Sequence, residues 1–247
     1  MSHTWVTADR DAAGGRPCVR VGSDRPRGRG HIGVRVLSAV PHRVRIALVA
    51  EGGLLMAGDD VSIGMRVGSG LALDVVEPAG TVAYDMRGGQ ARWRVEADVA
   101  AAARLVWRAE PFVVSTGALV DRSVVVQLGD SGVAVLRETL VLGRAAETGG
   151  VLRQRFRANV DGVPLLAEDL TVDGSRPQPG VLGRCRVLDS MSVLGERATG
   201  TPTPPGAHRL ELDGPGTVLR YLGDAVHSSP LGAAWAAATA VPDTVRL

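Results

Sequence analysis

Short apolar, β-branched segments dominate the chain between Arg43 and Val172, and each ends at a glycine or an Asp-Gly turn. Within many of them apolar and polar positions alternate, which is the period of a half-buried β-strand. The same alternation predicts two strands in His31–Ala50, broken at Pro41. Further strands are expected at Val61–Val67, Leu71–Val76, Ala91–Glu96, Ala103–Trp107, Ser123–Leu128, Val133–Leu142, Leu152–Asn159, Val163–Asp169 and Arg184–Leu188. Many strands at regular spacing indicate a mainly β fold: a sandwich, a barrel or a β-solenoid.

The predicted strands differ in expected burial. The stretch Arg137–Arg144 has an apolar centre, which suits a strand covered on both faces. By contrast, Arg153, Arg155 and Arg157 alternate with apolar or uncharged residues, so this strand should keep one face in water and lie nearer an edge. No exact repeat of fixed length is visible, so the pattern does not require a regular solenoid.

The two ends of the chain have a different character. Residues 1–30 place several arginines among glycine and proline, which favours a disordered basic arm over a binding segment. Near the other end, Ser229 and Pro230 suit a helix start, because serine can cap free amides and proline tolerates the first helical position. A short helix is expected at Leu231–Ala240, within a helical segment at about 229–241. Residues 31–247 should form one β-rich domain.

Composition adds few constraints. The chain is 45% hydrophobic but only 3% aromatic, so the core must be aliphatic. All 28 basic residues are arginine, interleaved with 26 acids, and no aromatic stacking platform accompanies them, so nucleic acid is not an expected partner. Cys18 and Cys185 are not expected to form a disulfide. With no signal-peptide pattern and no long apolar run, no membrane association is expected and the cytoplasm is the expected location.

Reactive constellations are missing from the sequence. None of the five histidines is spaced from another as joint metal ligands on one element are, so no closed metal site is predicted, although His208 and His227 could converge in space. The nucleophile-elbow, phosphate-loop and dinucleotide motifs are absent. Ser115 and Ser190 have no adjacent histidine or other base, so an esterase-like reading is disfavoured.

Carboxylates beside or inside apolar strands are the notable polar feature. They are Asp59, Glu110, Glu138 and Asp169. A carboxylate among β-branched residues must be paired or meet water, since unpaired burial costs several kcal/mol. Glu138 is therefore either ion-paired with an arginine or part of a polar interior passage, along which carboxylates could hand on a cation.

Three stretches in this order resemble the urease accessory protein D family, UreD or UreH. They are Gly52-Gly53-Leu54-Leu55-Met56-Ala57-Gly58-Asp59 with Val61–Gly70, then Glu110-Pro111-Phe112 continued to Ala118, and Arg137–Arg144 continued by Gly149-Gly150, Arg153-Gln154-Arg155 and Asp161–Leu166. Each is weak alone, but the order and spacing match over about residues 33–172. The nearest likeness is to shorter, arginine-rich actinobacterial members.

The resemblance implies a non-catalytic scaffold for urease maturation, with an elongated body of many antiparallel or mixed β-strands, β-helical or in layered sheets. Members of that family bind the urease apoprotein on one side and the helical UreF on the other, and UreF recruits the GTPase UreG. Nickel is thought to travel through the interior, so transient Ni²⁺ is expected and no permanent cofactor. The passage would map onto Asp59, Glu110, Glu138 and Asp169, and the UreF side onto Leu231 and Trp235. Trp235 packing its helix onto the sheet is an equal alternative.

Departures from the family pattern limit what can be carried over. Val82 stands where many members have lysine, and the segment before Gly33 looks eroded or replaced. The main alternative is an all-β ligand-binding module with no metal role, whose mouth would be formed by the loops Tyr84–Gly89 and Glu110–Gly117.

Overall fold

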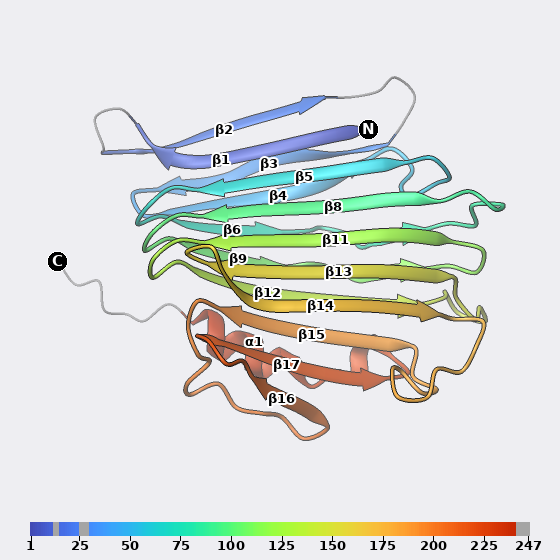
Figure 1. Cartoon of the computed structure of the whole chain (residues 1–247). Coiled ribbons are helices and arrows are strands. Elements are labelled where there is room, and N and C mark those ends of the chain that lie inside the picture. The colour runs from blue at the N-terminus through green and yellow to red at the C-terminus, as the bar shows by residue number, and fades with distance from the viewer. Residues whose placement is uncertain (12–14, 25–29, 241–247) are drawn as a thin grey trace.

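The computed structural model describes residues 1–11, 15–24 and 30–240 and contains two β-sheets, one short 3-10 turn and one α-helix. The seven-stranded sheet A has the order β14-β13-β11-β8-β5-β1-β2 and lies in front in Figure 1. Its strands are β1 Ser2–Arg10, β2 Pro17–Asp24, β5 Asp60–Val67, β8 Ala91–Val99, β11 Leu119–Leu128, β13 Val151–Val160 and β14 Val163–Asp173.

The larger sheet B lies behind sheet A and has ten strands, eight of them in the order β16-β17-β15-β12-β9-β6-β4-β3. These are β3 His31–Val40, β4 Arg43–Glu51, β6 Ala72–Val76, β9 Arg104–Arg108, β12 Val133–Leu142, β15 Val187–Leu194, β16 Ala207–Glu211 and β17 Gly216–Gly223. Two short strands, β7 Thr81–Ala83 and β10 Phe112–Val114, pair beside the end of β12.

The middle of the molecule is a two-sheet solenoid, because the chain alternates between the sheets and each new strand pairs in parallel with its predecessor. In sheet B, Arg43 lies opposite Ala72 and Ala72 opposite Arg104, which are steps of 29 and 32 residues. In sheet A, Val61 lies opposite Trp93, again 32 residues apart. The repeat therefore exists but alternates in length, so no single period reveals it in the sequence.

Both ends of the solenoid change to antiparallel pairing. At the N-terminal end, β2 pairs with β1 and β3 with β4; at the other end, β14 pairs with β13, while β15, β17 and β16 extend sheet B beyond β12. The aliphatic core lies between the sheets and includes fully buried Ile46, Ile63, Leu73, Leu105 and Leu152. Alternate residues of the stacked parallel strands face this core.

The predicted burial of the two contrasted strands is confirmed. β12 is buried on both faces, because sheet A covers one face and the helix α1, Leu231–Thr239, covers part of the other. β13 is one strand from the edge of sheet A and exposes Arg153 and Arg155. The prediction of a mainly β fold with a short C-terminal helix is confirmed as well.

The prediction of a disordered arm over residues 1–30 is contradicted, because β1 and β2 account for most of the described part of this segment. The sequence pattern does not predict β1, because the small, polar residues Ser2 and Thr4 face inward. There Thr4 Oγ1 donates a hydrogen bond to Ile32 O at 2.5 Å. Residues 12–14 and 25–29 of that predicted arm lie outside the described residues. The strand expected at Arg184–Leu188 instead begins at Val187.

The C-terminal helix ends one residue before the predicted Ala240, and residues 241–247 lie outside the described part. Pro230 takes the position before its first residue, and the Leu231 N–H approaches Ser229 Oγ only at 3.4 Å. The Ser229 hydroxyl donates instead to Asp189 on β15. None of the described helices is long and apolar enough to cross a membrane.

Asp189 is fully buried under the start of α1 and accepts hydrogen bonds from several side chains. Arg137 donates to it from Nη2 at 2.7 Å and from Nε at 3.2 Å, and Thr139 donates from Oγ1 at 3.1 Å. Together with Ser229 these bonds join β12, β15 and the segment before the helix. Beside them, Val135, Met191, Leu219, Leu231 and Ala234 form a second apolar cluster between α1 and the sheet.

We expect Asp189→Ala to lower the free energy of unfolding by about 3–5 kcal/mol, because it leaves the Arg137 guanidinium buried without its partner. It should also loosen α1, which hydrogen–deuterium exchange of residues 231–239 would detect. Asp98→Ala is the matched control, since its 3.5 Å pair with Arg66 is more than half exposed and should be worth about 1 kcal/mol or less. Equal effects of the two substitutions would contradict the anchoring role.

Candidate functional site

A line of polar side chains crosses the aliphatic interior between the two sheets. We call it the interior polar seam, and its members are Glu77, Glu110, Arg122, Glu138, Gln154, Glu168, Ser190 and Arg220. Two small cavities follow this line and share the Glu138 and Leu140 side chains. Their volumes of about 10 and 20 Å³ are enough for about one water molecule each. The seam consists of three groups of polar contacts, around Glu77, Arg122 and Arg220, and these small cavities lie along it.

Glu77 lies at one end of the seam, just after β6. Its Oε1 accepts a hydrogen bond from Trp107 Nε1 at 3.0 Å, and its Oε2 accepts one from the Glu110 backbone N–H at 3.1 Å. Burial raises the pKa of Glu77 from 4.5 to about 7, although these donors and the charge of Arg122 act in the opposite direction. With this raised pKa, the Glu77 carboxyl is partly protonated near neutral pH.

Arg122 forms the centre of the seam. It points inward from β11, pairs with Glu138 on β12, and donates from Nη1 to Gln154 Oε1 on β13 at 2.8 Å. Its guanidinium also lies 5.5 Å from the centre of the Phe112 ring. The side chains of Arg122 and Glu138 are 4% and 15% exposed. An ion pair this deep depends on both partners, because either one alone would be a buried, uncompensated charge.

The other end of the seam lies under β14 and β17. Arg220 pairs with Glu168 at 2.8 Å and donates from Nε to Ser190 Oγ at 3.2 Å. Glu168, Ser190 and Arg220 line the larger of the two cavities together with Glu138 and Gln154. Away from the end that contains Glu77 and Glu110, each carboxylate of the seam is paired with a guanidinium group.

The structure brings together only some of the carboxylates assigned to a passage. Glu110 and Glu138 line the same cavity. Asp59 is buried in the turn before β5, where its Oδ2 accepts the Met56 N–H at 2.8 Å. Asp169 is not in the interior, because it lies on the solvent side of β14 and binds Arg157 at 2.8 Å. Its neighbour Glu168 faces inward, as the alternation of side chains along a strand requires.

Glu77, Arg122 and Glu168 were not among the residues predicted for the passage. One available signal was the dipeptide Glu-Pro, which occurs at Glu77-Pro78 and again at Glu110-Pro111, close to one solenoid repeat later. Both copies follow a strand of sheet B at the same end of the molecule. For Glu138 the sequence left open an ion pair with an arginine or a place in a polar passage, and the ion pair is confirmed by its contact with Arg122.

The stretches that carry the family resemblance assemble side by side. The Leu55 N–H donates to Val82 O at 2.7 Å, Phe112 on β10 lies opposite Thr81 on β7, and Phe112 also lies opposite Leu140 on β12. Val82, which stands where many members have lysine, is half-buried within β7. These segments build the end of the seam that contains Glu77 and Glu110.

The loops suggested as a ligand mouth are in contact with each other. The Met86 N–H donates to Gly117 O at 3.0 Å. A Cβ on Gly117, whose φ is +81°, would lie 2.3 Å from Asp85 Oδ1, so a side chain already fills this space. The contact closes the gap between the loops at this point.

The two helix residues assigned to a partner have different positions. Leu231 is fully buried in the cluster beneath α1, so it cannot contact a partner directly. Trp235 is half-buried and packs against the same cluster. The exposed positions of the helix are Gly232, Ala233, Ala236 and Ala237.

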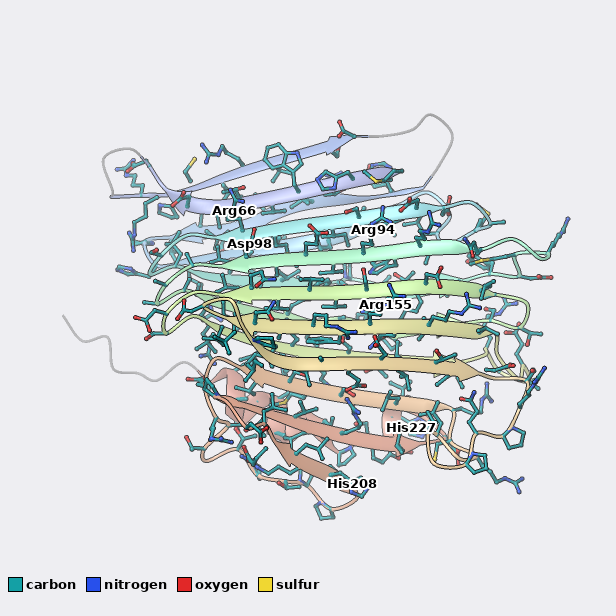
Figure 2. All side chains as sticks on the ribbon, viewed as in Figure 1. Arg66, Arg94, Asp98, Arg155, His208 and His227 are labelled. Carbon is teal, nitrogen blue, oxygen red and sulfur yellow. The ribbon has the colours of Figure 1, made fainter. Side chains whose placement is uncertain are left out.

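The serines and histidines do not form a reaction centre in the described part of the chain. Ser115 Oγ is buried without a hydrogen-bond partner, and Ser190 Oγ accepts from Arg220. His208 lies on β16 and His227 on the 3-10 turn before α1 (Figure 2). Among the described residues, no three His, Cys, Asp or Glu side chains are grouped as metal ligands.

Glu77→Gln should change how stability depends on pH. Between pH 4.5 and about 7 the folded state holds a proton on Glu77 that the unfolded state has lost, so the free energy of unfolding falls as pH rises, by at most about 1.4 kcal/mol per pH unit. Glutamine has no charge to bury, so the variant should lose this part of the slope. The measurement is urea unfolding of the unchanged chain, of Glu77→Gln and of the exposed control Glu96→Gln at about pH 5, 6 and 7. If the free energy of unfolding changed equally with pH in all three proteins, the raised pKa of Glu77 would be refuted.

Comparison with known proteins identifies the family. The sequence matches the family model of the UreD urease accessory protein over residues 30–242. It is 45% identical over 221 residues to urease accessory protein UreD 1 of Streptomyces griseus, covering 89% of this chain and 84% of that protein. It is 30% identical over 253 residues to UreD of Streptomyces avermitilis, covering 96% and 94%, and 33% identical over 193 residues to UreD of Frankia alni, covering 68% and 65%. The chain therefore belongs to the family of UreD urease accessory proteins.

Proposed function

We propose that this chain is a non-catalytic maturation factor for urease in the cytoplasm. It would join the urease apoprotein to UreF-like and UreG-like accessory proteins and conduct Ni²⁺ through its interior polar seam. The observation that carries the proposal is the family match over residues 30–242, which supports a role in urease maturation. The partners and the route of nickel are our inference beyond that role.

The chemistry of the seam suits a cation that must be released again. Carboxylate and amide oxygens bind a divalent transition metal less tightly than a closed set of cysteine and histidine ligands would. Glu77, Glu110, Glu138 and Glu168 supply such oxygens in sequence along the interior. Weak, successive oxygen contacts let a cation move from one step to the next.

The guanidinium groups define what must change during passage. Arg122 and Arg220 occupy the places beside Glu138 and Glu168 that a cation would take. Because the cavities hold about one water each, a nickel ion can enter only if these side chains turn aside. We infer that Ni²⁺ exchanges with the arginine as the partner of each carboxylate, which keeps the buried charge compensated throughout.

The exposed side of α1 is our choice for the UreF-like partner. Its small side chains, glycine and alanine, let another helix approach closely. Leu231 would act indirectly, by holding the helix on the sheet, and Trp235 would border the contact.

Removal of this chain from cells that co-express urease and its accessory proteins should abolish nickel incorporation. The measurement is the nickel content of purified urease together with its activity. Adding back the full chain should restore both. Urease that is loaded normally without the chain would contradict the maturation role and favour an all-β binding module.

Glu138→Gln should reduce the nickel content of co-expressed urease, because it removes the carboxylate shared by both cavities. The paired variant Arg122→Gln/Glu138→Gln tests the same loss without an unpaired guanidinium in the interior. Asp169→Asn is the control, since it removes a carboxylate on the outer face of a neighbouring strand. Full loading with a folded Arg122→Gln/Glu138→Gln protein would exclude the seam as the nickel route and leave the scaffold role standing.

A further inference from the structure

The open face of sheet A carries a groove bordered by arginines, which none of the roles above uses. Its volume is about 370 Å³. We call it the arginine groove, and its surface residues are Arg92 and Arg94 on β8, Asp121 and Ser123 on β11, and Arg153 and Arg155 on β13. Figure 2 labels Arg94 and Arg155 on this face. No described helix covers this sheet on its outer side (Figure 1).

Strand register explains the shape of the groove. Asp121 lies between Arg92 and Arg153, and Ser123 lies between Arg94 and Arg155. Long arginines on the outer two strands therefore flank shorter side chains on the middle one. Because adjacent strands are about 4.8 Å apart, the two walls stand about 10 Å apart at the backbone. This width suits an extended polypeptide, whereas a helix with its side chains is about 10–12 Å across.

The charges of the groove are not balanced. Arg94 pairs with Asp60 at 2.6 Å, and Arg153 makes a long contact of 3.7 Å with Asp121. Arg92 and Arg155, diagonally opposite each other, form no ion pair with any described residue. Asp169 on β14 lies opposite Arg155 and interacts with its charge, but both of its carboxylate oxygens accept hydrogen bonds from Arg157 Nη2. The groove thus presents forked, positively charged donors to solvent.

The outward arginines of β8 are followed by acidic residues on the same strand. Further along β8 the outward residues are Glu96 and Asp98, and Asp98 lies 3.5 Å from Arg66. A nucleic acid needs a longer basic track and gains from aromatic stacking, but the groove is short, has Asp121 in its floor and has no aromatic residue in its lining. A short run of carboxylates fits these limits, because guanidinium forks match carboxylates in geometry and charge.

We propose that the arginine groove docks a short, extended, carboxylate-rich segment of a partner protein. This inference deepens the proposed function and rests on it, because the proposed scaffold role is what makes the partner a protein. Arg92 and Arg155 make the contacts that determine affinity, and Arg94 and Arg153 complete the walls. Binding is electrostatic, so it weakens as salt screens the exposed charges.

The test uses the full chain and a fluorescein-labelled hexaglutamate peptide, followed by fluorescence anisotropy at about 0.05 M salt. We expect binding that weakens with added salt and is absent for the matching hexaglutamine peptide. The variant Arg92→Gln/Arg155→Gln should weaken binding about tenfold or more, because it removes two charge-assisted contacts. Arg66→Gln, on the same face outside the groove, should bind as the unchanged protein does.

Three results would overturn the proposal: no binding of hexaglutamate, equal binding by the unchanged chain and the Arg92→Gln/Arg155→Gln variant, or tighter binding of a single-stranded oligonucleotide through the same arginines. The substituted side chains make no ion pair among the described residues, and an unchanged unfolding midpoint checks that the variant is folded. The result is separable from the proposed function. If deleting the chain stops nickel loading of urease but hexaglutamate does not bind, only the groove proposal is refuted. If hexaglutamate binds but urease is loaded normally without the chain, only the maturation role is refuted.

Discussion

The stacking of parallel strands from two sheets over one aliphatic core is the constraint on which the rest of this structure depends. Every strand must place alternate side chains between the sheets, and the core residues there are almost all Val, Leu, Ile and Ala. Parallel register then places equivalent positions of successive repeats beside each other. Any polar side chain that points inward is therefore brought next to the inward residues of neighbouring strands, and must find its partner among them.

The interior polar seam is the result of this constraint. Arg122 on β11 reaches Glu138 in the opposite sheet and Gln154 on the next strand of its own sheet, so one guanidinium satisfies acceptors from two layers. Among the described residues, Glu77 has hydrogen-bond donors but no cation in direct contact, and burial raises its pKa to about 7. The seam thus combines compensated charges with one carboxyl that can be neutral, an arrangement that keeps a line of polar groups inside an apolar body.

The outward faces of the two sheets are covered differently. Sheet B buries part of its outer side under α1, anchored by the Asp189 contacts and a second apolar cluster. Sheet A keeps a polar outer side on which the same alternation that fills the core lines up arginines from β8 and β13. In the roles proposed above, one partner would pack against the helix and another would be held by charge on the open sheet.

Much of this fold could be predicted from the sequence because alternation is a local property. Most strands from His31 to Asp173, the burial of β12 on both faces, the solvent-exposed face of β13 and the C-terminal helix follow from patterns within about ten residues. The short strands β7 and β10 were not predicted. The β1 strand could not be recognised, since Ser2 and Thr4 occupy inward positions and only the contact with Ile32 shows why they are tolerated. The repeat was hidden because its steps alternate between 29 and 32 residues.

The candidate site, like the fold, could be predicted from the sequence only in part. By itself the sequence determined that carboxylates stand inside apolar strands, that reactive clusters are absent and which family the motifs resemble. Only the tertiary structure decided that Glu138 meets Arg122, that Glu168 faces the interior while Asp169 faces water, and that Glu77 belongs beside Glu110. The physical reason is that these contacts join residues about 16 to 52 positions apart. Strand register and the side to which each residue points, not local pattern, set such contacts.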